Sequence, residues 1–287
     1  MVGNGLSTSP STVPPTQRAA FPLVTIGDNV RLQARHTSRQ AVAPLAATTA
    51  FALFTAFRTA LTLRLSSPSL HQHALVTRHL GIQSLALVYG YSMGAMQALH
   101  WSALYPALVP RVAATCGTAT CHQYNAVFLE GLLAILGEAG DGEKQPNMGA
   151  FGRVYAGWGL PDSWYRQQLW RQHGGHASLD AFLRDSWEGW TTRAVPDDMR
   201  CQLHTWRHGA LTTQQLGGIT ARVVYLPSPG DRYFNLQDVT EEAACVPRSS
   251  IVPLSTDWGH RAGDPHRPGQ EGDFEVVRAA VHQLLRT

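Results

Sequence analysis

The stretch LALVYGYSMGAMQALHW, residues 85–101, decides the fold that this sequence predicts. It opens on a continuous apolar run that ends in glycine, which is typical of a buried parallel strand. The residues that close it predict an amphipathic helix. Between the two, residues 90–94 (GYSMG) fit the Gly-x-Ser-x-Gly pattern, in which a sharp strand-to-helix turn exposes a serine. The stretch therefore predicts that Ser92 is a nucleophile at the end of a parallel strand.

Strand and helix patterns alternate along the rest of the chain. Short apolar runs predict four strands, at 84–89, 111–116, 221–227 and 249–254. Such alternation indicates an α/β fold, with a mostly parallel sheet, right-handed crossovers and flanking helices. With four strands only, strand 84–89 is expected to be an unpaired apolar edge.

Residues 122–206 have a mainly helical pattern. They hold Trp158, Trp164, Trp170, Trp187, Trp190 and Trp206, out of eight tryptophans in the chain. A block this aromatic between two strands predicts a lid over a pocket, although packing of a helical core explains each tryptophan equally well. The predicted organisation is an α/β core at 1–121 and 207–287 with a helical lid at 122–206.

Composition narrows the class of protein. The chain has 287 residues, of which 44% are hydrophobic and 15% charged, as in a globular protein. The net charge of +3 comes from scattered arginines, so we expect no nucleic-acid partner. Four cysteines match no C-x-x-C spacing, and the N-terminus shows no secretory signal, so a cytoplasmic location is predicted.

Residues 41–57 form a charge-free run of 17 residues, at the lower limit of a membrane span. Its many alanines and threonines make it less apolar than a typical span. A membrane helix is therefore the less favoured interpretation, and no membrane partner is expected.

A serine hydroxyl needs a base to take its proton and a carboxylate to orient that base. After a nucleophile turn, these partners follow in the order acid, then histidine. Asp231 and His260 each come directly after a predicted strand, and parallel strands end at the same edge of a sheet. Asp257 is a rival carboxylate, but it lies on the same loop as His260 and is better explained as a loop cap. We predict Ser92 as nucleophile, His260 as base and Asp231 as acid.

The other histidines are weaker candidates for the base. Some precede Ser92, some lie in the helical block, and two downstream ones follow no strand: His71, His73, His79, His122, His173, His176, His204, His208, His266 and His282. The HQH triplet at 71–73 has no further ligand cluster, so no metal site is predicted.

Acyl transfer also needs two backbone N–H donors for the oxyanion. The backbone of Met93, the residue after the nucleophile, is predicted to supply one. The other comes from a loop that follows an earlier strand, and no such strand is evident before Ser92. The second donor is therefore expected to be missing.

Residues 90–131, from GYSMGAMQ to FLEG, resemble the nucleophile region of the homoserine O-acetyltransferase-like branch of the α/β-hydrolase superfamily. The likeness continues in FGRVYAGWGLPDSWYR, SWEGW, DRYF and WGHRAGDP. It implies an α/β-hydrolase fold with Ser92, Asp231 and His260 as nucleophile, acid and base. It also implies serine-dependent acyl transfer through an acyl-enzyme, either as an O-acyltransferase or as an ester hydrolase.

The resemblance implies acetyl-coenzyme A as acyl donor and no tightly bound cofactor. The expected partners are a small-molecule acyl donor and acceptor, and a homodimer stays open. The chain has GYSMGA and GHRAGDP where the methionine-pathway enzymes tend to have GGSMGG and GHDAFL. Homoserine is therefore not predicted as the acceptor.

The N-terminal part departs from the similar proteins. In them GNGLS, here at residues 3–7, follows the first strands, and DNVRLQ runs directly into HALVTRHLGI. The first strands of the fold are therefore expected to be missing, and residues 34–72 to be an atypical insert. A truncated, intron-retaining gene model explains both features. In that case the alternative function is a catalytically impaired or non-catalytic product.

Overall fold

The computed structural model describes residues 23–26, 49–54, 72–137, 145–264 and 269–287. Its centre is a six-stranded sheet whose strands stand in chain order, every neighbouring pair being parallel. The strands are β1 (Leu23–Ile26), β2 (Thr49–Phe54), β3 (Ser84–Tyr91), β4 (Arg111–Thr115), β5 (Arg222–Leu226) and β6 (Ser249–Ile251). The four predicted strands correspond to β3–β6.

The prediction of only four strands is wrong, because β1 and β2 precede β3 in the sheet. β2 lies inside the predicted insert, residues 34–72, and pairs with β3, so that Phe54 stands opposite Gly90. Strand 84–89 is therefore not an edge. The pattern hid β2 because a short apolar run within an alanine-rich segment looks alike in a strand and in a buried helix.

The same strand bears on the proposed membrane helix at 41–57, since residues 49–54 of that run lie in the sheet. Within the described ranges, no helix is both long and apolar enough to cross a membrane.

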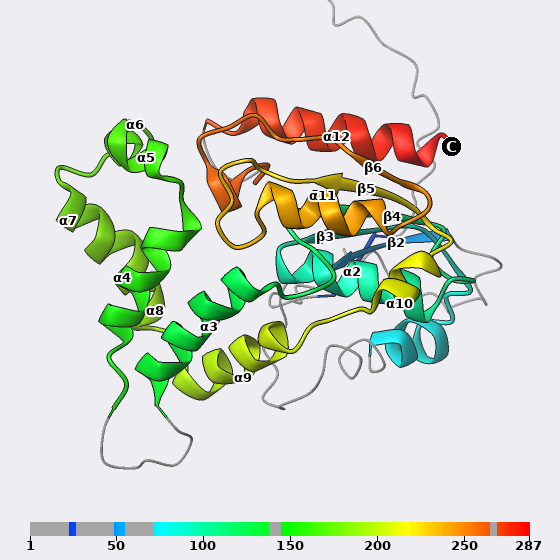
Figure 1. The fold of residues 1–287 in the computed structure, drawn as a ribbon, viewed down its shortest axis with the longest axis horizontal. Coiled ribbons are helices and arrows are strands. Elements are labelled where there is room, and N and C mark those ends of the chain that lie inside the picture. Colours follow the sequence, from blue (N-terminus) through cyan, green and yellow to red (C-terminus); the bar gives the residue numbers. More distant parts are fainter. Residues whose placement is uncertain (1–22, 27–48, 55–71, 138–144, 265–268) are drawn as a thin grey trace, which may run out of the picture.

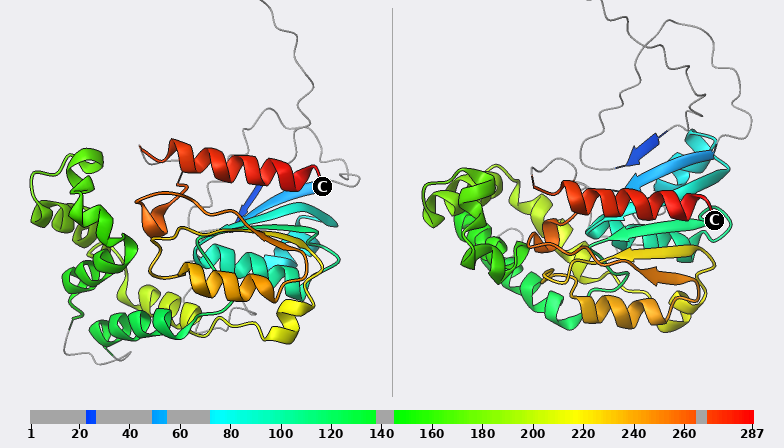
Figure 2. Two further views of the ribbon diagram at one scale, coloured as in Figure 1. Left: turned by 45° about the horizontal axis from the view of Figure 1, so that its top comes forward. Right: turned by 90° about the horizontal axis from the view of Figure 1, so that it is seen from above.

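Helices cover both faces of the sheet (Figure 2). α2 (Met93–Leu104) and α11 (Leu236–Ala244) pack on one face in a common apolar cluster with β3, β4 and β5. α12 (Glu271–Leu285) packs on the other face. α2 is not amphipathic as predicted, because residues 93–102 are all buried. Its Met96 packs against lid helices while Ala95 and Ala98 face the sheet, so both sides of the helix are covered.

A long run of helices connects β4 to β5 and lies to one side of the sheet (Figure 1). We call residues 122–206 the lid segment. Its elements are α3 (Gln123–Leu136), α4 (Met148–Gly159), α5 (Asp162–Arg166), α6 (Leu169–Gly174), α7 (Leu179–Phe182), η2 (Leu183–Glu188), α8 (Gly189–Thr191) and α9 (Pro196–Arg207). The other helical elements are η1 (Leu75–His79), α10 (Thr213–Gly217) and η3 (Gly259–Arg261).

Candidate active site

The turn between β3 and α2 holds Ser92 in a strained backbone conformation, with φ 57° and ψ −126°. Residues other than glycine rarely adopt such angles, and they persist where the surrounding structure enforces them. Gly90 is needed for this turn, since a Cβ on it would lie 2.1 Å from the carbonyl oxygen of Gly94. Gly117, in the loop after β4, packs closely against the same turn, although the sequence did not single it out. A Cβ added to Gly117 would lie 2.7 Å from the backbone carbonyl oxygen of Ser92.

The structure brings together the three residues that the sequence predicted. His260 Nε2 lies 2.8 Å from Ser92 Oγ, and His260 Nδ1 lies 2.8 Å from Asp231 Oδ2. The Asp231 side chain is fully buried and that of His260 is 11% exposed. With its proton on Nδ1, the imidazole donates to Asp231 and accepts from the serine hydroxyl. This arrangement suits proton abstraction from Ser92.

Asp231 is held by its own loop, which follows β5. Its Oδ1 accepts hydrogen bonds from the backbone N–H groups of Tyr233 (2.8 Å) and Phe234 (3.1 Å), which leaves Oδ2 for His260. The rival carboxylate, Asp257, accepts instead from Gln167 Nε2 at the surface, at 3.3 Å. The geometry therefore favours Asp231 over Asp257.

Three of the rival histidines within the described residues have partners other than Ser92. His176 Nε2 lies 3.1 Å from Ser186 Oγ, and the His73 ring stacks on Tyr105 with centroids 3.9 Å apart. His122 Nδ1 lies 3.6 Å from an Asp238 oxygen. His71 and His266 lie outside the described residues.

Met93 is the first residue of α2, so its N–H is among those that have no partner within the helix. The N-terminal end of the helix dipole also favours negative charge there. A strand upstream of Ser92 does reach this edge, contrary to expectation, because β2 ends at Phe54 opposite Gly90. The prediction about a second oxyanion donor concerns the residues after β2, and 55–71 lie outside the described residues.

Aromatic rings surround His260, which the sequence did not predict. The Tyr233 ring meets the imidazole edge to face with centroids 4.5 Å apart, and Tyr91 and Phe234 lie at 5.6 Å and 5.8 Å. The ring of Phe128, from the lid segment, lies 4.8 Å from Tyr233. The candidate base therefore lies beside an apolar wall shared by the core and the lid segment.

A buried carboxylate supports the loop after β4. Glu242 of α11 accepts hydrogen bonds from the N–H groups of Ala119 and Thr120 and from the hydroxyl of Tyr225. Burial raises the pKa of Glu242 to about 7, although these hydrogen bonds oppose the shift. Gly117 of the same loop contacts the Ser92 turn. By holding this loop, Glu242 indirectly stabilises the position of the turn. An acidic residue inside an amphipathic helix gave no signal of this role.

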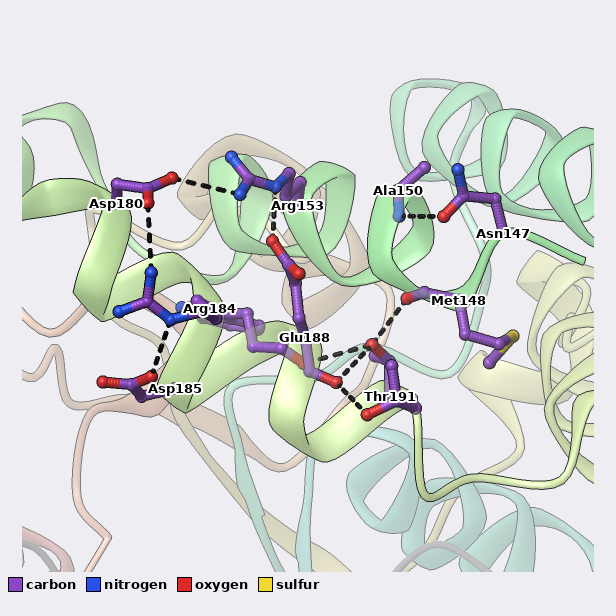
Figure 3. Close-up of polar contacts among 11 residues, drawn as sticks. Asn147, Met148, Ala150, Arg153, Asp180, Arg184, Asp185, Glu188 and Thr191 are labelled. Carbon is purple, nitrogen blue, oxygen red and sulfur yellow. Dashed lines mark hydrogen bonds and ion pairs between the residues drawn. The ribbon is translucent and has the colours of Figure 1, made fainter.

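Ion pairs cross the outer surface of the lid segment (Figure 3). Arg153 of α4 pairs with Asp180 of α7 at 3.1 Å and with Glu188 of η2. Arg184 also pairs with Asp180, at 3.3 Å. Beside them, the hydroxyl of Thr191 donates to the carbonyl oxygen of Met148 at 2.6 Å. These contacts hold α4 against η2 and α8.

The part of the chain that the structure describes contains no group of three or more His, Cys, Asp or Glu side chains placed to bind a metal ion. All four cysteines are free thiols. The hydrogen-bonded chain of Ser92, His260 and Asp231 is the candidate catalytic centre.

Comparison with known proteins supports the same interpretation of the fold. The sequence profile of the α/β-hydrolase fold family matches residues 70–139. The chain is 27% identical over 205 residues to the ethyl acetate hydrolase of Pseudomonas veronii, which covers 66% of this chain and 58% of that protein. It is 26% identical over 215 residues to the homoserine O-acetyltransferase of Chlorobium luteolum, covering 67% of this chain and 58% of that enzyme.

Among solved structures, that of the acetyl esterase MekB is similar with a TM-score of 0.71 and 25% identity, covering 79% of this chain and 69% of that one. The chain has an α/β-hydrolase fold, as its sequence predicted. It spans less than two thirds of the length of both curated relatives. Relatives include both esterases and homoserine acetyltransferases, so the comparisons support the wider fold group rather than one branch.

Proposed function

We propose that this protein is a serine-dependent acyl-transfer enzyme that hydrolyses short-chain acyl esters. The observation that carries the proposal is the continuous chain of hydrogen bonds from Asp231 through His260 to Ser92, with both bonds to the imidazole at 2.8 Å. A buried carboxylate, an oriented imidazole and a strained serine at a helix N-terminus are the parts that nucleophilic acyl transfer requires.

In the proposed mechanism, Ser92 Oγ attacks the ester carbonyl carbon while His260 Nε2 takes the hydroxyl proton. Asp231 holds Nδ1–H and stabilises the imidazolium that forms. The N–H of Met93 donates to the oxyanion. His260 then returns the proton to the departing alkoxide, which leaves as an alcohol, and an acyl-enzyme remains. Water attacks this ester with His260 as base, which releases the acid and restores Ser92.

The choice of water as acceptor rests on the relatives. The ethyl acetate hydrolase and the acetyl esterase have names that describe hydrolysis of acetyl esters. A second candidate is transfer to an alcohol acceptor with acetyl-coenzyme A as donor, which the homoserine O-acetyltransferase relative favours. Both use the same acyl-enzyme and differ in what reaches it.

The nucleophile is tested with a fluorophosphonate probe, which labels activated serines. Wild-type protein is expected to be labelled at Ser92, and Ser92→Ala to lose the label. Ser102→Ala is the matched control, since that serine lies on the same helix with its hydroxyl bonded to the Leu99 carbonyl at 2.7 Å. Equal labelling of wild type and Ser92→Ala contradicts the proposal.

The acceptor is tested by product analysis. With p-nitrophenyl acetate, hydrolysis yields acetate whether or not a small alcohol is added, whereas a transferase forms the acetylated alcohol at the expense of acetate. Rapid deacetylation of acetyl-coenzyme A only when an alcohol is present favours the second candidate. A folded protein with no turnover of any ester or acyl-coenzyme A favours the non-catalytic alternative.

A further inference from the structure

We propose that Tyr91 is a positioning residue, whose phenol fixes the backbone of His260 against the nucleophile turn; this rests on the proposed function. Tyr91 occupies the first variable position of Gly-x-Ser-x-Gly. Its hydroxyl donates a hydrogen bond to the carbonyl oxygen of His260, 169 residues further along the chain. The rings of the two residues lie 5.6 Å apart between centroids.

The strand geometry explains why Tyr91 points at the histidine loop. Side chains alternate between the two faces of a strand, so Leu87, Tyr89 and Tyr91 share one face of β3. All three pack in the cluster that contains α12 and Ala262 of the histidine loop. Ser92 then begins the turn. Two consecutive residues thus bind one histidine. The Tyr91 hydroxyl bonds to the backbone of His260, and the Ser92 hydroxyl bonds to its imidazole ring.

His260 lies on a long loop whose start is joined to β5 and to the loop after it by backbone hydrogen bonds, from Val252 N–H to Tyr225 and from Leu254 N–H to Pro227. β6 ends at Ile251, and His260 lies in the short helical turn η3. The backbone hydrogen bonds of that turn, such as Ala262 N–H to Gly259, stay within the loop. They fix its shape but not its distance from the nucleophile. The Tyr91 bond joins the loop to β3, the strand that leads into Ser92.

The phenol stays a donor at the pH of any ester assay, because burial raises the pKa of Tyr91 well above its ordinary value. Phenylalanine at this position keeps the ring and removes the donor, leaving the His260 carbonyl oxygen without that partner. A small displacement of a catalytic group lowers the rate without weakening substrate binding.

The test compares Tyr91→Phe with Tyr165→Phe. Tyr165, on α5, also donates its hydroxyl to a backbone carbonyl, that of Ala156 at 2.6 Å, so the control removes the same kind of bond from a carbonyl that belongs to no triad residue. With p-nitrophenyl acetate, Tyr91→Phe is expected to lower kcat about 10-fold to 100-fold with KM within about twofold. Tyr165→Phe is expected to change kcat less than about twofold. Thermal unfolding of both variants reports any general loss of stability.

Equal kcat in the two variants, or a loss in Tyr91→Phe that appears in KM alone, overturns the positioning role. The proton NMR signal of His260 Nδ1–H provides a second readout that needs no turnover. It is expected to shift in Tyr91→Phe and to stay unchanged in Tyr165→Phe, and an unchanged signal in both also overturns the proposal. Failure of the proposed function gives a different result, since the wild type itself is then not labelled at Ser92.

Discussion

The triad and the lid segment are held together in opposite ways. Asp231 and His260 are bound by short, buried hydrogen bonds, and the Ser92 turn closes through backbone contacts that only glycine permits. The outer surface of the lid segment is held by exposed ion pairs around Arg153, which solvent and salt screen. The difference teaches that the three side chains of the candidate triad each have one position, whereas the ion-paired outer surface of the lid segment tolerates change.

The largest expected effect tests the triad side of this comparison. Asp231→Asn removes the charge that orients His260 and disfavours its productive tautomer, so kcat for an ester is expected to fall about 10³-fold to 10⁴-fold. Asp257→Asn, which alters only the surface contact with Gln167, is the control and is expected to keep wild-type activity. Steady-state kinetics on p-nitrophenyl acetate measures both. Wild-type kcat in Asp231→Asn would contradict the view that the candidate triad is more tightly constrained than the lid segment.

The next effect concerns the turn itself. Gly90→Ala places a Cβ against the Gly94 carbonyl, and we expect it to lower the free energy of unfolding by about 3 kcal/mol or more. Gly157→Ala, at a helical position of α4 with open space around it, is expected to leave stability unchanged or to raise it by about 0.5–1 kcal/mol. Urea denaturation compares the two. Similar losses in both variants would mean that the turn is no more constrained than the lid segment.

A smaller effect is expected in the pH dependence of stability, through Glu242, which holds the loop after β4. Because the pKa of Glu242 is raised to about 7 in the folded protein, the folded state binds more protons than the unfolded state between about pH 4.5 and 7. The contribution of this group to stability is therefore present at low pH and is lost as the pH rises through that window, by at most about 1.4 kcal/mol per pH unit.

Glu242→Gln is expected to remove this part of the pH dependence. Glu241→Gln, its exposed neighbour on α11, is expected to keep the wild-type slope. Denaturant unfolding at several pH values between 4.5 and 8 measures the difference. A wild-type slope in Glu242→Gln contradicts the assignment of the buried carboxylate.

The smallest effect is expected in the lid segment. Arg153→Ala breaks two exposed ion pairs, with Asp180 and Glu188, and is expected to lower Tm by no more than about 2 °C and to leave kcat unchanged. High salt is expected to abolish even this difference. A large loss of stability or activity in this variant would show that the lid segment is as tightly specified as the triad.

Much of the site could be predicted from the sequence, because its constraints are local. The turn needs glycines at fixed spacing around Ser92, and the acid and base follow strands whose ends share an edge. β2 escaped prediction because its strand character depends on pairing with β3, which a short apolar run does not reveal. The contacts of Tyr91 and Glu242 escaped because they join residues more than 100 positions apart.

The positive φ of Ser92 has a consequence for how this chain changes by mutation. Glycine accommodates that conformation more easily than serine, which bears a cost of about 1–3 kcal/mol. A lineage released from catalysis therefore gains stability by drifting to glycine at this position, and selection for stability alone removes the hydroxyl. Under the proposed function, this strain is the stability cost of holding the Ser92 hydroxyl at the end of β3.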